Sequence, residues 1–316
     1  MSSKELSKEI KYKAIELGFS KVGITNAQFY KEDQIYLDRW IKKQRHASMD
    51  WIVPRKSERA NIFNYYPEAK SVIVVGINYY TGVSPRADNI ARFSNYAWGD
   101  DYHELIKKKL YYLLGHLKSL DKNLNGLVCV DTAPVTEKAW AQRAGLGWIG
   151  KHTNLLTRDF SSWLLLGVLV INKELVFDEP YSYDMCGSCT ACIDECPTDA
   201  LIEPYQLDAN KCISYLTIEH RGEIPSKFHG KLNNWIYGCD ICQEVCPWSK
   251  TFSQITENPL FQPRSNVDKR TIDEWNKLTE DEFRILFKKS AVKRTKYEGL
   301  MRNIKLVRAH NLKNPN

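Results

Sequence analysis

The 316-residue sequence lacks any apolar run of the length that a membrane-spanning helix needs, about 20 residues. Its first residues, Met-Ser-Ser-Lys-Glu-Leu, contain neither an apolar signal-peptide core nor a pair of arginines. No internal repeat stands out apart from the cysteine motifs. We therefore expect a globular protein that is neither inserted in a membrane nor exported, and that stays in the cytoplasm.

Acidic residues are nearly missing from the C-terminal part of the chain, where Glu298 is the only acid between residues 284 and 313. The basic residues of this stretch are Arg284, Lys288, Lys289, Lys293, Arg294, Lys296, Arg302, Lys305, Arg308 and Lys313. Such a run is most often a solvated helical surface. It is also the charge pattern of a protein that binds a nucleic-acid backbone, and both interpretations stay open here.

The composition is that of an ordinary globular protein, with 43% hydrophobic and 26% charged residues. Helix patterns cover residues 4–17 and 103–118, and short β-branched or apolar runs predict strands at 21–24, 71–77, 127–130 and 163–171. This alternation predicts an α/β layered N-terminal domain over residues 1–175. Further helices are expected at 271–289 and 293–309, so the fold class is mixed α+β or α/β.

Eight of the nine cysteines lie between residues 186 and 246, in two sets. The first set is Cys186, Cys189, Cys192 and Cys196, and the second is Cys212, Cys239, Cys242 and Cys246. The run C-x2-C-x2-C-x3-C-P is the spacing of bacterial two-cluster ferredoxins, in which the fourth cysteine ligates the other cluster. We therefore predict two 4Fe–4S clusters. One is held by Cys186, Cys189, Cys192 and Cys246, and the other by Cys212, Cys239, Cys242 and Cys196.

Two other uses of these cysteines fit less well. A disulfide framework belongs to small proteins in oxidising compartments. Zinc sites favour paired C-x2-C units with four ligands per metal. The ninth cysteine, Cys129, lies in a strand-like Leu-Val-Cys-Val run and is expected to be a packed core thiol.

Gly145, Gly147 and Gly150 match G-x-G-x-x-G by spacing, but they follow a predicted helix instead of a strand. We therefore do not interpret them as a dinucleotide site. A loop close to a ligand and a tight turn that needs glycine are both open.

Asp131 directly follows the strand predicted at 127–130. An acid at the C-terminal end of a buried strand lies where α/β sheets bind their ligands, although a loop or helix-capping aspartate is about equally consistent.

Four segments closely resemble the epoxyqueuosine reductase family: residues 131–139, 143–151, 212–219 and 237–248. Residues 96–103 match the same family, and the resemblance extends over roughly residues 5–305. It implies a cobalamin-dependent enzyme that reduces epoxyqueuosine to queuosine at the wobble position of tRNA, with cobalamin on the N-terminal domain and a ferredoxin-like domain covering it.

The resemblance also implies roles for single residues. Asp131 falls on the catalytic proton donor, and we expect burial to raise its pKa so that it is protonated near neutral pH. Arg59, Asn154, Ser214, Cys239 and Asp240 fall on cobalamin contacts. Arg221 falls near a tRNA contact, and Lys293, Arg294 and Lys296 supply charge for the tRNA backbone.

The expected domains are a cobalamin-binding domain at 1–175, a ferredoxin-like domain at 176–260 and a basic helical segment at 261–316. Many family members continue into helical repeats of HEAT type, which we expect to be truncated or absent here. The expected partners are tRNA bearing epoxyqueuosine and a low-potential electron donor of ferredoxin or flavodoxin type, with the enzyme a monomer. Two alternatives remain: a corrinoid reductive dehalogenase, and a ferredoxin-type electron-transfer protein without a substrate.

Overall fold

The structure is a computed structural model that describes residues 1–82, 89–264 and 267–313. Its centre is a four-stranded sheet in the order β1-β2-β7-β4. These strands are β1 (Lys21–Asn26), β2 (Ser71–Asn78), β7 (Leu164–Ile171) and β4 (Gly126–Cys129). All three neighbouring pairs are antiparallel. The predicted strands are confirmed.

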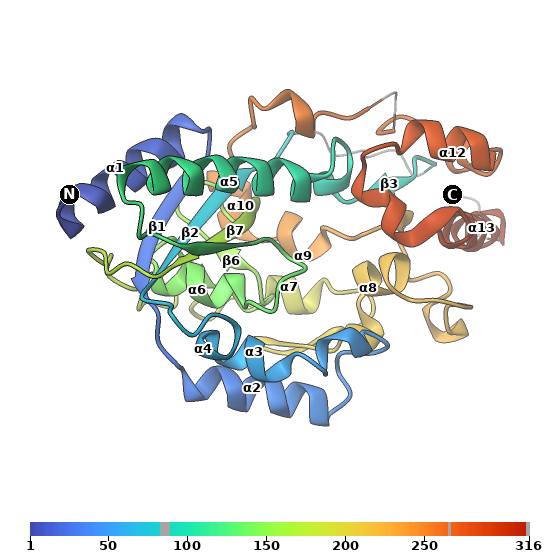
Figure 1. The fold of residues 1–316 in the computed structure, drawn as a ribbon. Coiled ribbons are helices and arrows are strands. Elements are labelled where there is room, and N and C mark those ends of the chain that lie inside the picture. The colour runs from blue at the N-terminus through green and yellow to red at the C-terminus, as the bar shows by residue number, and fades with distance from the viewer. Residues whose placement is uncertain (83–88, 265–266, 314–316) are drawn as a thin grey trace.

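Every residue of β2 is buried, because the sheet is covered on both faces. On one face, α1 (Ser3–Glu16) and α5 (Tyr102–Leu120) pack their apolar side chains against Ile73 and Leu169. On the other face, Trp140 of α6 (Glu137–Arg143) packs against Val72 and Val170. Figure 1 shows the sheet between these two helical layers. The mixed α/β class is confirmed, and Cys129 is fully buried as expected.

The shorter elements of the first half include three helices that the sequence analysis did not predict. They are α2 (Lys31–Lys42), α3 (Lys56–Ala60) and α4 (Ile62–Tyr65). A hairpin of β5 (Trp148–Ile149) and β6 (Leu155–Leu156) follows α6.

The cysteine-rich part consists of short elements. They are α7 (Ala191–Asp194), β8 (Leu201–Glu203), β9 (Gln206–Leu207), α8 (Ile213–Ile218), β10 (Trp235–Tyr237), α9 (Ile241–Glu244) and α10 (Pro247–Phe252). Of these, α10 lies beside the sheet and α8 lies on the side away from α1 (Figure 1). Strand β3 (Arg92–Phe93) pairs in parallel with β10, and one core contains apolar residues from 91–98 and from 209–307. The domain boundaries at 175 and 260 stay a prediction.

The helix predicted over 271–289 is wrong as a continuous element. The chain forms α11 (Ile272–Trp275) and α12 (Glu280–Leu286) instead. Each helix begins with a capping box, in which a threonine and the glutamate three residues later bind each other's backbone N–H. The last predicted helix is confirmed as α13 (Lys296–Lys313), preceded by a 3₁₀ turn. Within the described ranges, no helix is long and apolar enough to cross a membrane.

Candidate active site and cofactor cavities

The two predicted cysteine sets line two different cavities. Cys186, Cys189, Cys192 and Cys246 line a cavity of about 110 Å³. Cys196, Cys212, Cys239 and Cys242 line a larger cavity of about 480 Å³. The last cysteine of each motif therefore faces the other motif's cavity, which is the crossed arrangement that the spacing predicts. The ligation itself stays a prediction.

The chemistry of these cysteines fits iron–sulfur clusters. None of them forms a disulfide in the structure. Burial raises the pKa of Cys192 to about 11 and holds the pKa values of Cys239 and Cys242 well above their ordinary value. Buried sulfurs of this kind become thiolates when a positive metal core neutralises them. Four sulfurs around each cavity are the donor set of a 4Fe–4S cluster.

Lys151 supports the smaller cavity, a role that the sequence analysis missed. Its Nζ donates hydrogen bonds to the carbonyls of Gly187 and Cys189, at 2.5 and 2.9 Å, and its side chain is nearly buried. The lysine thus fixes the backbone of the first cysteine loop.

The glycine-rich segment before Lys151 forms a tight hairpin. A Cβ on Gly147 would lie 1.9 Å from the Leu156 carbonyl oxygen, so only glycine lets the two short strands approach this closely. Gly145 has a φ of 74°, so the tight-turn interpretation is confirmed for that glycine. The segment also lies near a possible ligand site, because His152 and Asn154, which follow it, line the larger cavity.

Four of the five residues predicted to contact cobalamin line that 480 Å³ cavity: Asn154, Ser214, Cys239 and Asp240. A cavity of about 150 Å³ adjoins it and shares Tyr96, Lys138, Asn154 and Gln243 with it. The combined size is that of small-molecule sites, about 300–1,000 Å³. The lining of the larger cavity is mostly apolar with a few polar groups, which suits a large planar cofactor. Such a cofactor would lie against the cysteines of the same cavity.

Arg59, the fifth residue, does not line this cavity. It faces a separate cleft beside Glu58 and Thr136, with its guanidinium 5.2 Å from the centroid of the Trp51 ring. Its Nε is buried without a hydrogen-bond partner. Burial lowers its pKa, an effect that the nearby Glu137 charge opposes.

Asp240 is the most enclosed carboxyl of the larger cavity, at 1% exposure. It accepts hydrogen bonds from the Ser94 hydroxyl and, at 2.7 Å, from the Asn95 backbone N–H. Burial raises its pKa to about 6 in spite of these bonds. The Asp240 carboxyl therefore titrates at about pH 6 at the wall of the 480 Å³ cavity.

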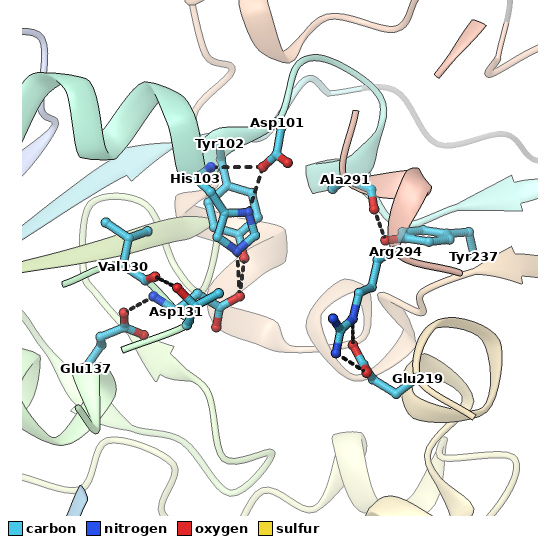
Figure 2. A network of polar contacts seen from close by, with 11 residues as sticks. Asp101, Tyr102, His103, Val130, Asp131, Glu137, Glu219, Tyr237, Ala291 and Arg294 are labelled. Atoms are coloured by element: carbon cyan, nitrogen blue, oxygen red, sulfur yellow. Dashed lines mark hydrogen bonds and ion pairs between the residues drawn. The ribbon is translucent and has the colours of Figure 1, made fainter. Parts of the chain in front are cut away.

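Asp131 lies just beyond β4, in a left-handed backbone conformation with φ of 53°. Its Oδ2 accepts a hydrogen bond from the Tyr102 hydroxyl at 2.8 Å and lies 2.9 Å from His103 Nε2. The other ring nitrogen of His103 lies 2.6 Å from Asp101 Oδ1. Figure 2 shows the side chains of Asp101, His103 and Asp131 in a row. It also shows the Asp131 backbone N–H donating to Glu137.

This network contradicts the raised pKa expected for Asp131. Burial raises its pKa, but the hydrogen bonds from His103 and Tyr102 and the positive charge of His103 outweigh burial, so the pKa is lowered. Burial lowers the pKa of His103, but Asp101 and Asp131 outweigh that effect and raise it to about 9. At neutral pH the histidine is therefore protonated and Asp131 is a carboxylate.

Glu137 is a second unusual carboxyl beside Asp131. Burial, helped by the Asp131 charge, raises its pKa to about 8. Its oxygen accepts the Asp131 N–H from the first residue of α6. Glu137 is thus protonated at neutral pH and holds the strained turn at Asp131 in place.

The predicted tRNA contacts come together at a different place. Arg221 donates to the Arg294 carbonyl at 2.9 Å. Arg294 forms a bidentate ion pair with Glu219, with both distances 2.7 Å (Figure 2). Lys293 and Lys296 are exposed beside it. Arg302, in the same basic run, instead donates to three backbone carbonyls around α8 and has a structural role.

The residues missed from the sequence are Tyr102, His103, Glu137, Lys151 and His152. The first four lie within the segments that carry the family resemblance, which was the available signal. His152 follows directly after such a segment and carried no signal of its own.

Two family models match parts of the chain. One is described as "Epoxyqueuosine reductase QueG, DUF1730" and matches residues 59–132. The other is described as "4Fe-4S double cluster binding domain" and matches residues 185–249.

The curated relatives include the epoxyqueuosine reductase of Cellulophaga algicola, which is 44% identical over 305 residues, 96% of this chain and 99% of that protein. The epoxyqueuosine reductase of Escherichia coli K12 is 38% identical over 95% of this chain and 80% of its own length.

Two solved structures have similar folds, each covering 98% of this chain and 82% of the other. One is an epoxyqueuosine reductase with a tRNA-Tyr epoxyqueuosine-modified stem loop, at 30% identity and a TM-score of 0.85. The other is the Bacillus subtilis epoxyqueuosine reductase with its catalytic aspartate loop swung out of the active site, at 29% identity and a TM-score of 0.89.

Proposed function

The chain belongs to the epoxyqueuosine reductase family, and from this we propose that it reduces epoxyqueuosine in tRNA to queuosine. One structural observation carries the proposal. Tyr102 donates a hydrogen bond to Asp131 and lines the 150 Å³ cavity. That cavity adjoins the 480 Å³ cavity, which is lined by Cys196, Cys212, Cys239 and Cys242. An electron source and a proton source thus meet at one site. The dehalogenase and simple electron-carrier alternatives are set aside because relatives at 44% identity share the reductase name over nearly their full length.

The reaction turns an epoxide into an alkene. Both carbon–oxygen bonds break, two electrons and two protons are consumed, and the oxygen leaves as water. When bound, the two clusters and cobalamin supply the electrons at low potential. The residues that would hold them are the two cysteine sets and, for cobalamin, Asn154, Ser214, Cys239 and Asp240.

Asp131 and His103 supply one of the two protons that the reaction consumes. Negative charge develops on the oxygen as its bonds to carbon break, and a positioned acid stabilises it. In the free enzyme the proton resides on His103 Nε2, 2.9 Å from Asp131 Oδ2. When substrate excludes water, neutral groups are favoured over the charged pair, so the proton moves to Asp131 and from there to the oxygen.

The neighbours of Asp131 position it for this transfer. Tyr102 donates to the same oxygen that faces His103, and Glu137 holds the Asp131 backbone. Asp101 keeps the histidine ring oriented and protonated. Asp131 is the catalytic residue of this set, and the other four residues position it or supply its proton.

The surface around Arg221, Lys293, Arg294 and Lys296 binds the tRNA backbone in this proposal. Its support is the contact between Arg221 and the segment that carries the other three residues, 73 positions further along the chain. The electron donor is a low-potential protein of ferredoxin or flavodoxin type, and the enzyme acts as a monomer in the cytoplasm, where cluster thiolates stay reduced.

The function is tested by nucleoside analysis of tRNA from cells that lack the protein. Epoxyqueuosine should accumulate at the expense of queuosine. Normal queuosine in those cells would contradict the proposal.

A further inference from the structure

His152 stands between the two cysteine-lined cavities. Among the residues that the structure describes, it is the one side chain that lines both the 110 Å³ and the 480 Å³ cavity. It is 3% exposed. Its position makes it a shared wall of the two proposed cluster sites.

The hydrogen bonds of the ring define where its proton lies. Nδ1 accepts a hydrogen bond from the Asn154 backbone N–H at 3.1 Å. A ring that accepts at Nδ1 is neutral and carries its proton on Nε2. That Nε2 is buried and has no hydrogen-bond partner among the described residues. The side chain therefore presents an unused N–H donor at the boundary between the cavities.

The ring is held in this position by the turn that carries it. The Gly150 N–H donates to the Asn154 carbonyl at 2.9 Å, and the Thr153 N–H donates to the Gly150 carbonyl at 2.8 Å. A Cβ on Gly150 would lie 3.1 Å from Cε1 of the ring and 3.3 Å from Nε2. Glycine at this position leaves room for the imidazole, and the turn fixes the direction of its donor.

A buried donor without a partner is costly, so such groups are rare in native proteins and usually meet a ligand or an ordered water. The cavities that His152 faces are each walled by four cysteines, so a cluster in either one would present sulfur acceptors. Hydrogen bonds to the sulfurs stabilise the more negative, reduced state of a cluster and raise its potential.

We propose that His152 Nε2 donates a hydrogen bond to a sulfur of one of the two clusters and raises the reduction potential of that cluster. His152 is then a tuning residue of the electron path, distinct from the proton machinery at Asp131. The inference rests on the cluster ligation proposed above and is independent of the tRNA substrate.

The test compares the cluster-loaded wild type with His152→Leu, His152→Gln and, as a matched control, His116→Gln. His116 lies on α5 and pairs with Glu9, away from the cysteines. Iron and sulfide content and the EPR signals of both reduced clusters are measured first. An EPR-monitored redox titration then gives each midpoint potential.

In the Leu variant, one cluster should become harder to reduce by at least about tenfold in its equilibrium constant, which is 59 mV for one electron. The Gln variant, which keeps an N–H donor at a similar reach, should retain most of the wild-type potential. The control should leave both potentials unchanged. Unchanged potentials in a Leu variant that holds both clusters would overturn the inference.

A second measurement applies if the Leu variant fails to assemble. Pulsed EPR on reduced wild type with ¹⁵N-labelled histidine should show a nitrogen coupling to one cluster, and His152→Gln should abolish it. Absence of this coupling in a loaded wild type would also overturn the inference. A wild type that binds no clusters would instead refute the cluster ligation itself.

Discussion

His103 Nε2 lies 2.9 Å from Asp131 Oδ2, although 28 residues separate them in the chain. The histidine lies in the first turn of α5, where the N-cap residue Asp101 binds its other ring nitrogen, and Asp131 lies just beyond β4. The pair places a protonated imidazole against the Asp131 carboxylate, whose other partner, Tyr102, lines the 150 Å³ cavity. In the proposed mechanism, proton supply therefore depends on two residues instead of one unusually weak acid.

Replacing Asp131 with Asn should remove proton delivery and leave the site assembled. The amide oxygen can still accept the Tyr102 hydrogen bond, so the clusters and cobalamin should bind normally. We expect turnover to fall by about 10² to 10⁴-fold, the usual contribution of a general acid. Single-turnover assays, with absorption spectra of both cofactors, measure the two effects separately.

Asp159→Asn is the control for that variant, because Asp159 forms an ion pair with Lys21 outside the cavities. It should keep wild-type turnover. Near-normal turnover in Asp131→Asn would remove Asp131 from the proton-transfer role.

The pH dependence of turnover should reveal His103. Its pKa is raised to about 9, so the proton is present below that pH and is lost as the pH rises through it. Turnover should therefore fall on the alkaline side near pH 9. In Asp101→Asn, the ring loses the carboxylate that supports its charge, and the fall should move to lower pH. An alkaline limb at the same pH in both proteins would show that His103 is not the group that titrates.

Glu137 should matter through its shape, since it is uncharged at neutral pH. Glu137→Gln keeps an oxygen that accepts the Asp131 N–H and should retain most activity. Glu137→Ala releases the turn and should lower kcat by roughly 10²-fold, the loss expected from a misplacement of about 1 Å. Comparing the two variants at pH 7 checks this, and equal activity in both would argue against a positioning role.

The basic surface is best tested at Lys293 and Lys296, because the charge of Arg294 is already paired with Glu219. Reversing both lysines to Glu should weaken tRNA binding and reduce the salt dependence of log Kd by about one per lost phosphate contact. The control reverses Lys4 and Lys8 on α1, at the opposite end of the molecule (Figure 1). If the dependence of log Kd on salt is the same in the test and control proteins, the two lysines belong to a solvated surface and do not bind tRNA.

Local patterns in the sequence predicted the strands of the central sheet. Short stretches of β-branched residues, such as residues 71–77, are typical of buried strands. The antiparallel order was not predictable, since it depends on pairing between residues about 100 positions apart, such as Ile73 with Leu169. The break between α11 and α12 was predictable in principle. Thr271 and Thr279 each precede a glutamate by three residues, the pattern of a capping box.

The site was predictable only in part. The cysteine spacing predicted two groups of four sulfurs, and the same two groups line the two cavities. The spacing could predict them because it reflects a local loop geometry. The pKa of Asp131 was mispredicted because its neighbour His103 comes from another element, and no local pattern reports such a contact. The cobalamin contact of Arg59 stays a prediction, because this residue lies in a separate cleft.

The central claim is that this chain reduces epoxyqueuosine in tRNA. Its most direct test is to load the purified protein with both clusters and cobalamin, confirm them by spectroscopy, and add a low-potential reductant with tRNA that carries epoxyqueuosine. Mass spectrometry of the digested tRNA should then show queuosine, lighter than the substrate nucleoside by one oxygen atom. Epoxyqueuosine left intact by the fully loaded protein would contradict the claim.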